Sequence, residues 1–228
     1  MISIIIPVFN EAEIIQKSLL HLKHEPGIEI IVVDGGSQDQ TVELVKALGI
    51  KIICSTQLGR ANQMNLGAAF ATGDILLFLH VDTYLPVGYQ QIVKETLFHP
   101  KTVAGAFEIA INGRQKSLRF VEKMVNWRSR FFSLPYGDQA IFLRASTFEE
   151  INGFVNLPIM EDYELIQRLK RRGKIAIAPA KVLTSERRWQ RLGVCKTTLI
   201  NQLIIVGYYL GISPSNLAQF YRQKWKKL

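Results

Sequence analysis

The chain has 228 residues, of which 48% are hydrophobic and 21% charged, and its formal net charge is +9. This length predicts one large domain, or one domain with an appendage, and the hydrophobic fraction is sufficient for a sizeable core. The two cysteines, Cys54 and Cys195, lack the spacing of metal ligands and fit a reducing compartment. We predict that Cys54, at the end of an apolar run, is a buried small residue. A strand-like segment starts the chain without a basic leader, which argues against a signal peptide.

The positive charge is concentrated at the C-terminal end of the chain. No acidic residue follows Glu186, whereas basic residues continue to the end: Arg187, Arg188, Arg191, Lys196, Arg222, Lys224, Lys226 and Lys227. A nucleic acid, an anionic membrane surface or a phosphorylated ligand would each complement this charge.

The first half of the chain alternates apolar strands with helices. We predict strands over 2–8, 28–34, 50–54 and 75–80, and helices over 12–23, 41–48 and 61–71. Such an alternation indicates an α/β fold with a right-handed parallel sheet.

The second half is less regular. We predict strands over 103–111, 139–143 and 175–178, an amphipathic, basic and aromatic helix over 117–132, a helix over 161–172, and then C-terminal helices. We expect this half to form the acceptor side of a cleft.

The most informative segment is 31–41, where a β-branched run ends in Asp34, a glycine turn and a second acid, Asp39. Ligands of open α/β sheets bind outside the carboxyl ends of the strands, so we expect Asp34 at the edge of a cleft. Loops that bind phosphate usually present glycine amides, whereas carboxylates accept hydrogen bonds from a nucleobase or a ribose hydroxyl.

Two further acidic positions suggest chemistry. Asp82 follows a strand that we expect beside the strand of Asp34, and it could hold a divalent cation on a diphosphate or simply cap a turn. Glu161 and Asp162 begin a helix, where acids are common N-terminal residues; one of them could instead be a general base.

Two polar clusters are weaker candidates. Asp138 and Gln139 could line an acceptor pocket or form only a turn. Arg187 and Arg188 could neutralise a leaving diphosphate, and Trp189 could stack on a sugar ring. The alternative for this second cluster is a solvated basic turn with a half-buried tryptophan.

Taken in order, several segments resemble a family 2 glycosyltransferase of the GT-A fold, which has a Rossmann-type, mostly parallel sheet flanked by helices. The matching segments are 3–11, 32–41, 65–76, 78–82, 137–144 and 161–162. The pattern is also similar to the radical-SAM/selenodomain-associated transferase 2 subfamily. It covers residues 1–190 and implies a nucleotide-binding half (1–82), an acceptor half (83–190) and a basic C-terminal extension of amphipathic helices (191–228).

The resemblance implies roles for individual residues. Pro7 and Glu11 would border the nucleotide, Asp34 would accept a hydrogen bond from its base, and Asp82 would hold Mn²⁺ or Mg²⁺. Asp162 would be the catalytic base, with Glu161 beside it.

This chain departs from the family pattern at three positions. His80 stands where the metal motif usually begins with an acid, and Gly35 replaces the second acid of the usual Asp-Asp-Gly-Ser turn. Met64 stands where the family usually has an arginine, and Arg60 could supply that positive charge. We expect Arg60 and Arg188 to contact the donor.

Segment 199–212 is apolar on nearly all sides but shorter than the ~20 residues of a membrane span. It could pack on the core, or lie in a membrane interface with Tyr208, Tyr209, Tyr221 and Trp225 at headgroup depth. We favour contact with an anionic membrane surface, to which the basic stretch 114–130 could contribute.

The resemblance implies an inverting, metal-dependent glycosyltransferase that uses a nucleotide-sugar, a UDP-hexose. The basic, apolar C-terminal segment adds the expectation of an acceptor hydroxyl that is lipid-linked or lipophilic. We expect it in the cytoplasm, peripheral on the inner face of the cell membrane. A nucleotidyltransferase or a dinucleotide dehydrogenase usually has a glycine-rich loop after the first strand, which 7–11 lacks. A nucleic-acid-binding protein is not expected, because no known binding module is present. The alternatives are a catalytically weak protein that binds nucleotide-sugars and a nucleic-acid-binding protein that uses the basic C-terminal end.

Overall fold

The computed structural model describes residues 1–22 and 26–226, apart from the side chains at 188, 191, 225 and 226. The described strands form one sheet with the order β3-β2-β1-β4-β7-β6-β8-β5. The strands are β1 (Ile2–Val8), β2 (Ile28–Asp34), β3 (Lys51–Cys54), β4 (Ile75–Phe78), β5 (Thr83–Tyr84), β6 (Thr102–Asn112), β7 (Phe142–Arg144) and β8 (Lys174–Ser185).

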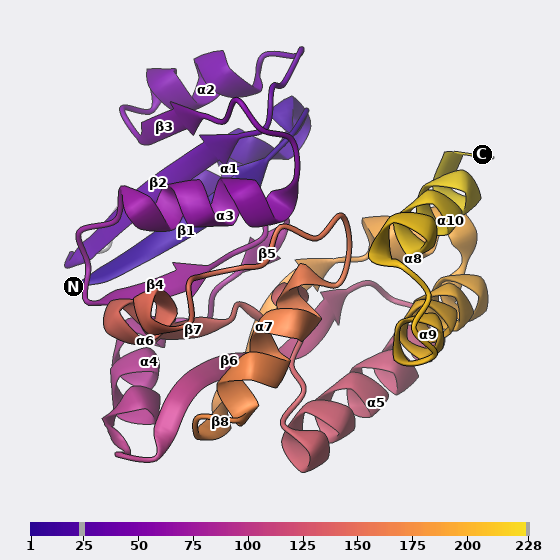
Figure 1. Cartoon of the computed structure of the whole chain (residues 1–228). Coiled ribbons are helices and arrows are strands. Elements are labelled where there is room, and N and C mark those ends of the chain that lie inside the picture. Colours follow the sequence, from indigo (N-terminus) through magenta and orange to yellow (C-terminus); the bar gives the residue numbers. More distant parts are fainter. Residues whose placement is uncertain (23–25, 227–228) are drawn as a thin grey trace.

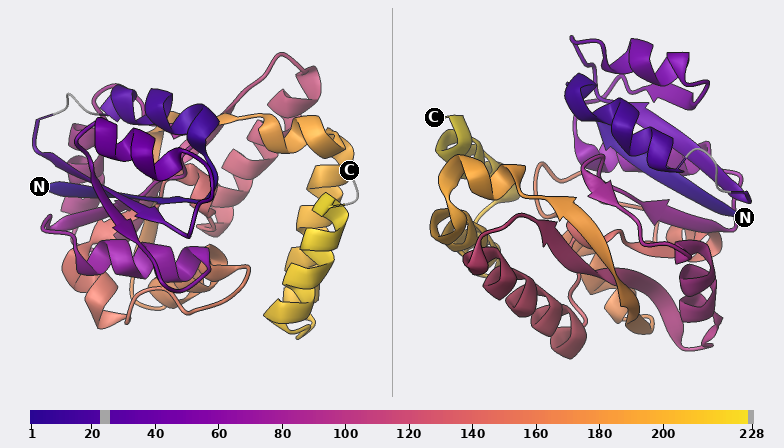
Figure 2. Two further views of the ribbon diagram at one scale, coloured as in Figure 1. Left: turned by 90° about the horizontal axis from the view of Figure 1, so that it is seen from above. Right: turned by 180° about the vertical axis from the view of Figure 1, so that it is seen from behind.

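Helices cover both faces of this sheet (Figure 1). They are α1 (Ala12–Leu22), α2 (Thr41–Ala47), α3 (Arg60–Ala69), α4 (Tyr89–Phe98), α5 (Lys116–Phe132), α6 (Ala145–Glu150), α7 (Glu161–Lys170), α8 (Arg187–Leu192), α9 (Val194–Tyr209) and α10 (Pro214–Lys226). A short 3₁₀ helix, η1, spans Gly137–Gln139. The helices α5, α8, α9 and α10 gather on one side of the molecule, away from β3, as Figure 2 also shows.

The parallel half of the sheet confirms the predicted α/β alternation. The strands β3, β2, β1 and β4 are all parallel, so their carboxyl ends meet at one edge. The strand β1 is buried on both faces: Ile4 and Ile6 pack with α1, α2 and α4, while Ile5 packs with α3, α6 and α7. This two-sided burial explains why its sequence is a continuous apolar run. The strand of Asp82 is not beside that of Asp34, however, because β1 lies between them.

The direction of the strands changes in the second half. The strand β7 is antiparallel to both β4 and β6, and β8 then pairs with β6 in parallel. The strand β8 is longer than the predicted 175–178. Its pairing with β6 shifts between Ala178 and Lys181, which places Pro179 in an irregularity of the ladder. Proline lacks the N–H that a regular ladder needs, and for this reason the sequence pattern predicts that the strand ends before Pro179.

Some local predictions were wrong or incomplete. The predicted strand 139–143 begins only at Phe142, because Gly137–Gln139 forms η1 and Ala140 has a positive φ of 50°. Four elements were not predicted. The elements α6, α8 and β5 are short, whereas α4 has ten residues and buries Tyr89, Val93 and Leu97 at helical spacing, a pattern that was overlooked. Cys54 is exposed rather than buried, since β3 is the edge strand of the sheet.

The C-terminal helices pack against the start of α7. Ile204 of α9 and Leu217 of α10 form a small core with Met160 and Tyr163 at the start of α7. The alternative that this segment packs on the core is therefore correct for one face of α9. Within the part of the chain that the structure describes, no helix is both long and apolar enough to cross a membrane.

Candidate active site

The carboxyl ends of β1, β2 and β4 bring three predicted site residues to one edge: Glu11 follows β1, Asp34 ends β2 and Asp82 follows β4. Gln63 of α3 joins two of these ends, because its amide nitrogen donates to the carbonyl oxygens of Val8 and Val33, each at 2.8 Å. The sequence had not singled out Gln63, since glutamine within a helix is usually exposed.

Asp34 is held by its own turn. Its side chain is buried, and its Oδ2 accepts hydrogen bonds from the backbone N–H groups of Gly36 at 2.8 Å and Ser37 at 2.9 Å. Its Oδ1 accepts from the Ser37 hydroxyl. An ionised carboxylate offers about four acceptor positions, so a nucleobase contact would use the remaining capacity of this group.

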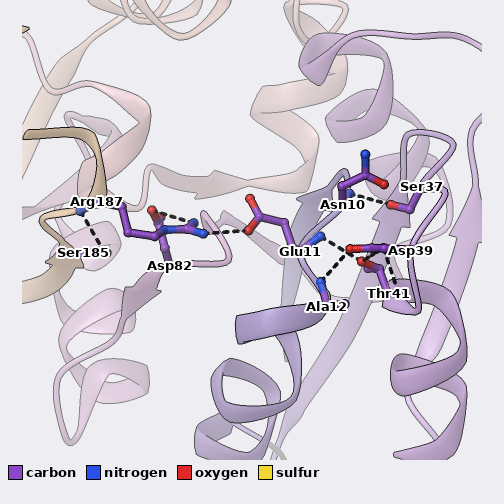
Figure 3. Close-up of polar contacts among 9 residues, drawn as sticks. All are labelled: Asn10, Glu11, Ala12, Ser37, Asp39, Thr41, Asp82, Ser185 and Arg187. Atoms are coloured by element: carbon purple, nitrogen blue, oxygen red, sulfur yellow. Dashed lines mark hydrogen bonds and ion pairs between the residues drawn. The ribbon is translucent and has the colours of Figure 1, made fainter. Parts of the chain in front are cut away.

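The second acid of this turn, Asp39, orders the loop rather than facing a ligand. Its carboxylate accepts from the N–H of Ala12 at 3.0 Å and from the N–H and hydroxyl of Thr41. The Thr41 hydroxyl in turn accepts from the N–H of Glu11 at 2.8 Å. The hydrogen bond from the Thr41 hydroxyl holds the pKa of Asp39 below its usual range. This network fixes Glu11 at the end of β1 (Figure 3).

Arg187 connects two of the predicted acids. Its Nη1 lies 3.0 Å from Glu11 Oε2, and its Nη2 lies 3.2 Å from Asp82 Oδ2 (Figure 3). Burial alone would lower the pKa of Arg187, but its hydrogen bonds to Glu11 and Asp82 raise it. The pairing of Thr83 with Thr184 between β5 and β8 brings α8 beside Asp82. The sequence suggested that Arg187 and Arg188 could neutralise a leaving diphosphate, and it did not predict the contacts of Arg187 with Glu11 and Asp82. The side chain of Arg188 is outside the described part of the structure.

Glu161 and Asp162 begin α7 directly after Met160, which has a positive φ of 69°. Asp162 Oδ2 accepts a hydrogen bond of 2.7 Å from the backbone N–H of Gly137. A side chain at Gly137 would crowd this contact, because a Cβ there would lie 3.0 Å from His80 Nε2 and 3.2 Å from Asp162 Oδ2. The side chains of His80 and Asp162 therefore both lie next to Gly137.

Glu161 lies deeper than its neighbour. It is 5% exposed and forms an ion pair of 3.3 Å with Arg60 Nη1. Burial raises the pKa of Glu161, the negative charge of Asp162 raises it further, and Arg60 opposes both effects. The two predicted acids therefore differ in environment: Glu161 is buried and paired with Arg60, whereas the carboxylate of Asp162 is more accessible.

This pKa shift predicts a pH-dependent stability. The unfolded chain releases the Glu161 proton near the ordinary pKa of 4.5, whereas the folded protein retains it to a higher pH. Stability therefore decreases as the pH rises through the raised pKa. Urea unfolding measures the free energy of unfolding of Glu161→Gln minus that of wild type. We expect this difference to increase from pH 4.5 to pH 8, because only the wild type loses stability through Glu161. A constant difference between the two proteins over this range would contradict the raised pKa.

A pocket of about 350 Å³ opens beside these acids. Its walls include His80, Asp138 and the Glu161–Asp162 pair, and on the other side residues of α9 and α10, such as Ile205 and Tyr221. A much smaller cavity of about 10 Å³ adjoins Pro7 at β1 and is also lined by Arg60, His80, Glu161 and Asp162. Pro7, Arg60 and the two acids of α7 are thus brought together, whereas Asp34 and Asp82 do not line the larger pocket.

Of the predicted acceptor residues, only Asp138 lines this pocket. Gln139 is fully buried, and its amide binds the Phe107 carbonyl at 2.8 Å and the Ser129 hydroxyl at 2.8 Å. Trp189 is 8% exposed and packs in a core with Ile109, Ile111, Leu118 and Val121. The predicted acceptor contacts of Gln139 and Trp189 are therefore not available in this arrangement.

Two tyrosines that the sequence did not single out, Tyr136 and Tyr163, line the pocket. Tyr136 stacks against the Arg128 guanidinium at 3.5 Å, and burial raises the pKa of Tyr136 to about 12. The hydroxyls of Tyr163 and Tyr209 are hydrogen-bonded to each other. Burial also raises the pKa of Tyr163, so the phenols of Tyr136 and Tyr163 offer hydrogen bonds rather than charge.

A divalent cation fits this site only in part. The described residues contain no group of three or more His, Cys, Asp or Glu side chains that could hold a metal ion. Mg²⁺, however, often takes one or two protein carboxylates together with substrate phosphate oxygens. Asp82 provides one such carboxylate, with His80 two residues before it, if Arg187 releases its contact with Asp82 Oδ2. The residues therefore fit a cation whose coordination is completed by a bound diphosphate.

The sequence comparison identifies the family. Residues 3–150 match the family model described as glycosyl transferase family 2, so this chain belongs to that family. An uncharacterized protein of Methanocaldococcus jannaschii is 27% identical over 205 residues, which cover 81% of this chain and 82% of that protein.

Solved structures confirm the GT-A type of fold. A mannosyltransferase from Pyrobaculum calidifontis, in complex with GDP-Man and Mn²⁺, has a TM-score of 0.67 at 18% identity over 89% of this chain. TarS from S. aureus, in complex with UDP-GlcNAc, has a TM-score of 0.66 at 20% identity over 82% of this chain. The matches cover 64% and 58% of those two chains, so this protein spans less than two thirds of their length.

Proposed function

We propose that this glycosyltransferase transfers a sugar from a nucleotide-sugar, a UDP-hexose, to an acceptor hydroxyl with inversion at the anomeric carbon. The observation that carries this proposal is the position of Asp162, held by the Gly137 amide at the wall of a pocket of about 350 Å³. Family membership and donor complexes of proteins with a similar fold support it.

In the proposed reaction, Asp162 is the general base. Its carboxylate takes the proton from the acceptor hydroxyl, and that oxygen forms a bond to the anomeric carbon of the sugar. The bond from this carbon to the diphosphate oxygen breaks on the opposite face, and the nucleoside diphosphate leaves. The transition state resembles the oxocarbenium ion of glycoside hydrolysis. The Gly137 N–H stabilises the ionised carboxylate and fixes its direction.

The donor would lie along the strand edge. We assign its nucleotide to Pro7, Glu11 and Asp34, and its diphosphate to the side chains of Arg60, Asp82 and Arg188. When bound, Mn²⁺ or Mg²⁺ would be held by Asp82 and the phosphate oxygens and would neutralise their charge. Arg187 already lies at this place and can orient Glu11 and Asp82. The acceptor would enter the larger pocket between α7 and the C-terminal helices, beside Asp138.

A thermal-shift panel tests donor binding. We expect UDP-hexoses with Mn²⁺ to raise the Tm by several degrees, because a ligand that binds only the native state stabilises it. Slow hydrolysis of the same donor without acceptor is the second expected result. Single-stranded nucleic acid serves as the control and should leave the Tm unchanged. A shift with nucleic acid and none with any nucleotide-sugar would refute the proposal.

Two observations favour a second candidate, a protein that binds nucleotide-sugars but transfers weakly. His80 replaces the usual first acid of the metal motif, and Arg187 occupies the carboxylate of Asp82. Donor stabilisation without donor hydrolysis, in the presence and absence of Mn²⁺, would identify this alternative.

We also propose peripheral contact with an anionic membrane, on the cytoplasmic face, and a lipid-linked or lipophilic acceptor. The basic C-terminal end supports this proposal, as does the apolar wall that Ile204 and Ile205 of α9 give to the pocket.

A further inference from the structure

Helix α5 exposes a continuous apolar stripe. Phe120 is 64% exposed, Met124 46%, Trp127 54% and Phe131 71%. The spacing of these residues, i, i+4, i+7 and i+11, places them on one face of the helix. The opposite face, with Leu118 and Val121, packs on β6. The stripe therefore faces away from the core. Within it, the Trp127 ring packs against the Phe131 ring with centroids 5.2 Å apart.

Helix α9 repeats the same arrangement. Leu199, Leu203 and Val206 of the helix, and Leu210 directly after its end, have the spacing i, i+4, i+7 and i+11. They are 60%, 48%, 52% and 76% exposed. The buried face of the helix, including Ile200 and Ile204, packs on the rest of the protein. Helices α5 and α9 contact each other, and both lie on the side of the molecule away from β3 (Figures 1 and 2). Large exposed apolar areas of this kind mark interaction sites.

The charge beside these stripes is positive. On α5, Lys116, Arg119, Lys123 and Arg130 are exposed along one border of the stripe. Arg119 pairs with Glu122 and Arg130 with Glu108, whereas the exposed amines of Lys116 and Lys123 add to the surface charge. On α9, Lys196 is exposed, and no acidic residue occurs anywhere after Glu186.

We propose that the exposed stripes of α5 and α9 form a docking surface for an anionic lipid bilayer. Helices with an aromatic, apolar face and lysine or arginine beside it bind in the plane of the membrane interface. A second copy of the chain fits less well, because a symmetric interface would place the basic borders of two α5 helices near each other. The charge thus selects the anionic bilayer as the occupant.

This surface connects to the pocket through α9. Outward, the helix presents Leu203 and Val206, and inward it presents Ile204 and Ile205 to the pocket beside Asp162. Docking would place one wall of the pocket next to the lipid. This consequence rests on the proposed transfer reaction, whereas the docking surface rests on the proposed peripheral membrane contact and specifies its location.

Co-sedimentation with vesicles tests the proposal. The full chain is expected to bind phosphatidylcholine vesicles that contain phosphatidylglycerol, and to bind pure phosphatidylcholine weakly. Trp127→Ser/Phe131→Ser should lower the affinity for the anionic vesicles about tenfold or more, because two aromatic anchors are lost. Lys116→Gln/Lys123→Gln should lower it less and reduce its salt dependence. Leu203→Ser/Val206→Ser tests the stripe of α9 in the same way.

The matched control is Val87→Ser/Phe98→Ser, which removes two side chains that are 97% and 84% exposed on other elements. This variant should bind vesicles like wild type. Unchanged vesicle binding in Trp127→Ser/Phe131→Ser would overturn the assignment. So would a wild-type protein that is dimeric without lipid and a double variant that is monomeric. Donor hydrolysis is measured separately in vesicle-free buffer. If the wild-type protein bound vesicles as expected but did not hydrolyse any donor, the proposed reaction would be rejected and the docking surface would stand.

Discussion

Replacing Asp162 with asparagine is expected to lower kcat by about 10³-fold, while the nucleotide affinity stays close to that of wild type. A general base contributes typically 10²–10⁴-fold, and an amide cannot accept the proton of the acceptor hydroxyl. The asparagine carbonyl can still accept the hydrogen bond from Gly137, so the local structure should persist. Steady-state kinetics with saturating donor, together with a thermal shift by UDP, measures both effects.

The matched control for this variant is Glu164→Gln. Glu164 lies on the same helix and pairs with Arg168 at 2.7 Å, outside the lining of the pocket. Its removal should change stability but not the chemical step. Turnover that survives in Asp162→Asn and disappears in Glu161→Gln would transfer the role of base to Glu161.

Replacing Arg187 with alanine is expected to lower kcat/KM for the donor by about 10²-fold, which corresponds to about 2.7 kcal/mol. Without the guanidinium, Glu11 and Asp82 lose the cation between them, and the strand edge gains uncompensated negative charge where the diphosphate would bind. Arg187→Lys should fall between alanine and wild type, because a single ammonium cannot form the two-sided contact. Donor kinetics at a series of Mn²⁺ concentrations measures this effect.

Arg172→Ala is the control for the ion pair itself. Arg172 pairs with Glu150 at 3.1 Å on the surface, and an exposed pair of this kind contributes at most about 1 kcal/mol to stability. If Arg187→Ala behaved like Arg172→Ala in kinetics as well as in stability, Arg187 would have only a structural role.

Several parts of the site were accessible from sequence because they depend on local chemistry. The run before Asp34 and the glycines after it form a strand and a turn, and Asp162 begins a helix as predicted. Gln139 and Trp189 show the limit of this reasoning. Their residue types suit an acceptor site, but Gln139 is buried by its contact with Phe107 of β6, and Trp189 by its packing on β6 and α5, segments distant in the sequence.

The contacts of Arg187 and the exposed stripe of α5 could not be predicted for a related reason. The ion pairs of Arg187 join residues 176 and 105 positions apart, and only the pairing of β5 with β8 brings them together. The amphipathic pattern of 117–132 predicted a helix, but either face of that helix could have been the buried one. The structure shows that the face of Leu118 is buried and the face of Trp127 is exposed.

By itself, the sequence determined the strand–helix alternation of the first half, the turn at Asp34, the family, and the acids that could perform the chemistry. The alternation, the turn and the candidate acids follow from hydrophobic periodicity and residue type, which act over a few neighbouring positions. The family follows from the order of its motifs along the chain, which residues 3–150 share with the family model. The tertiary structure alone decided which acids share a pocket, which cation lies on Asp82 and which polar side chains are buried. Those outcomes depend on contacts between segments far apart in the chain, and local preferences do not encode which segments will meet.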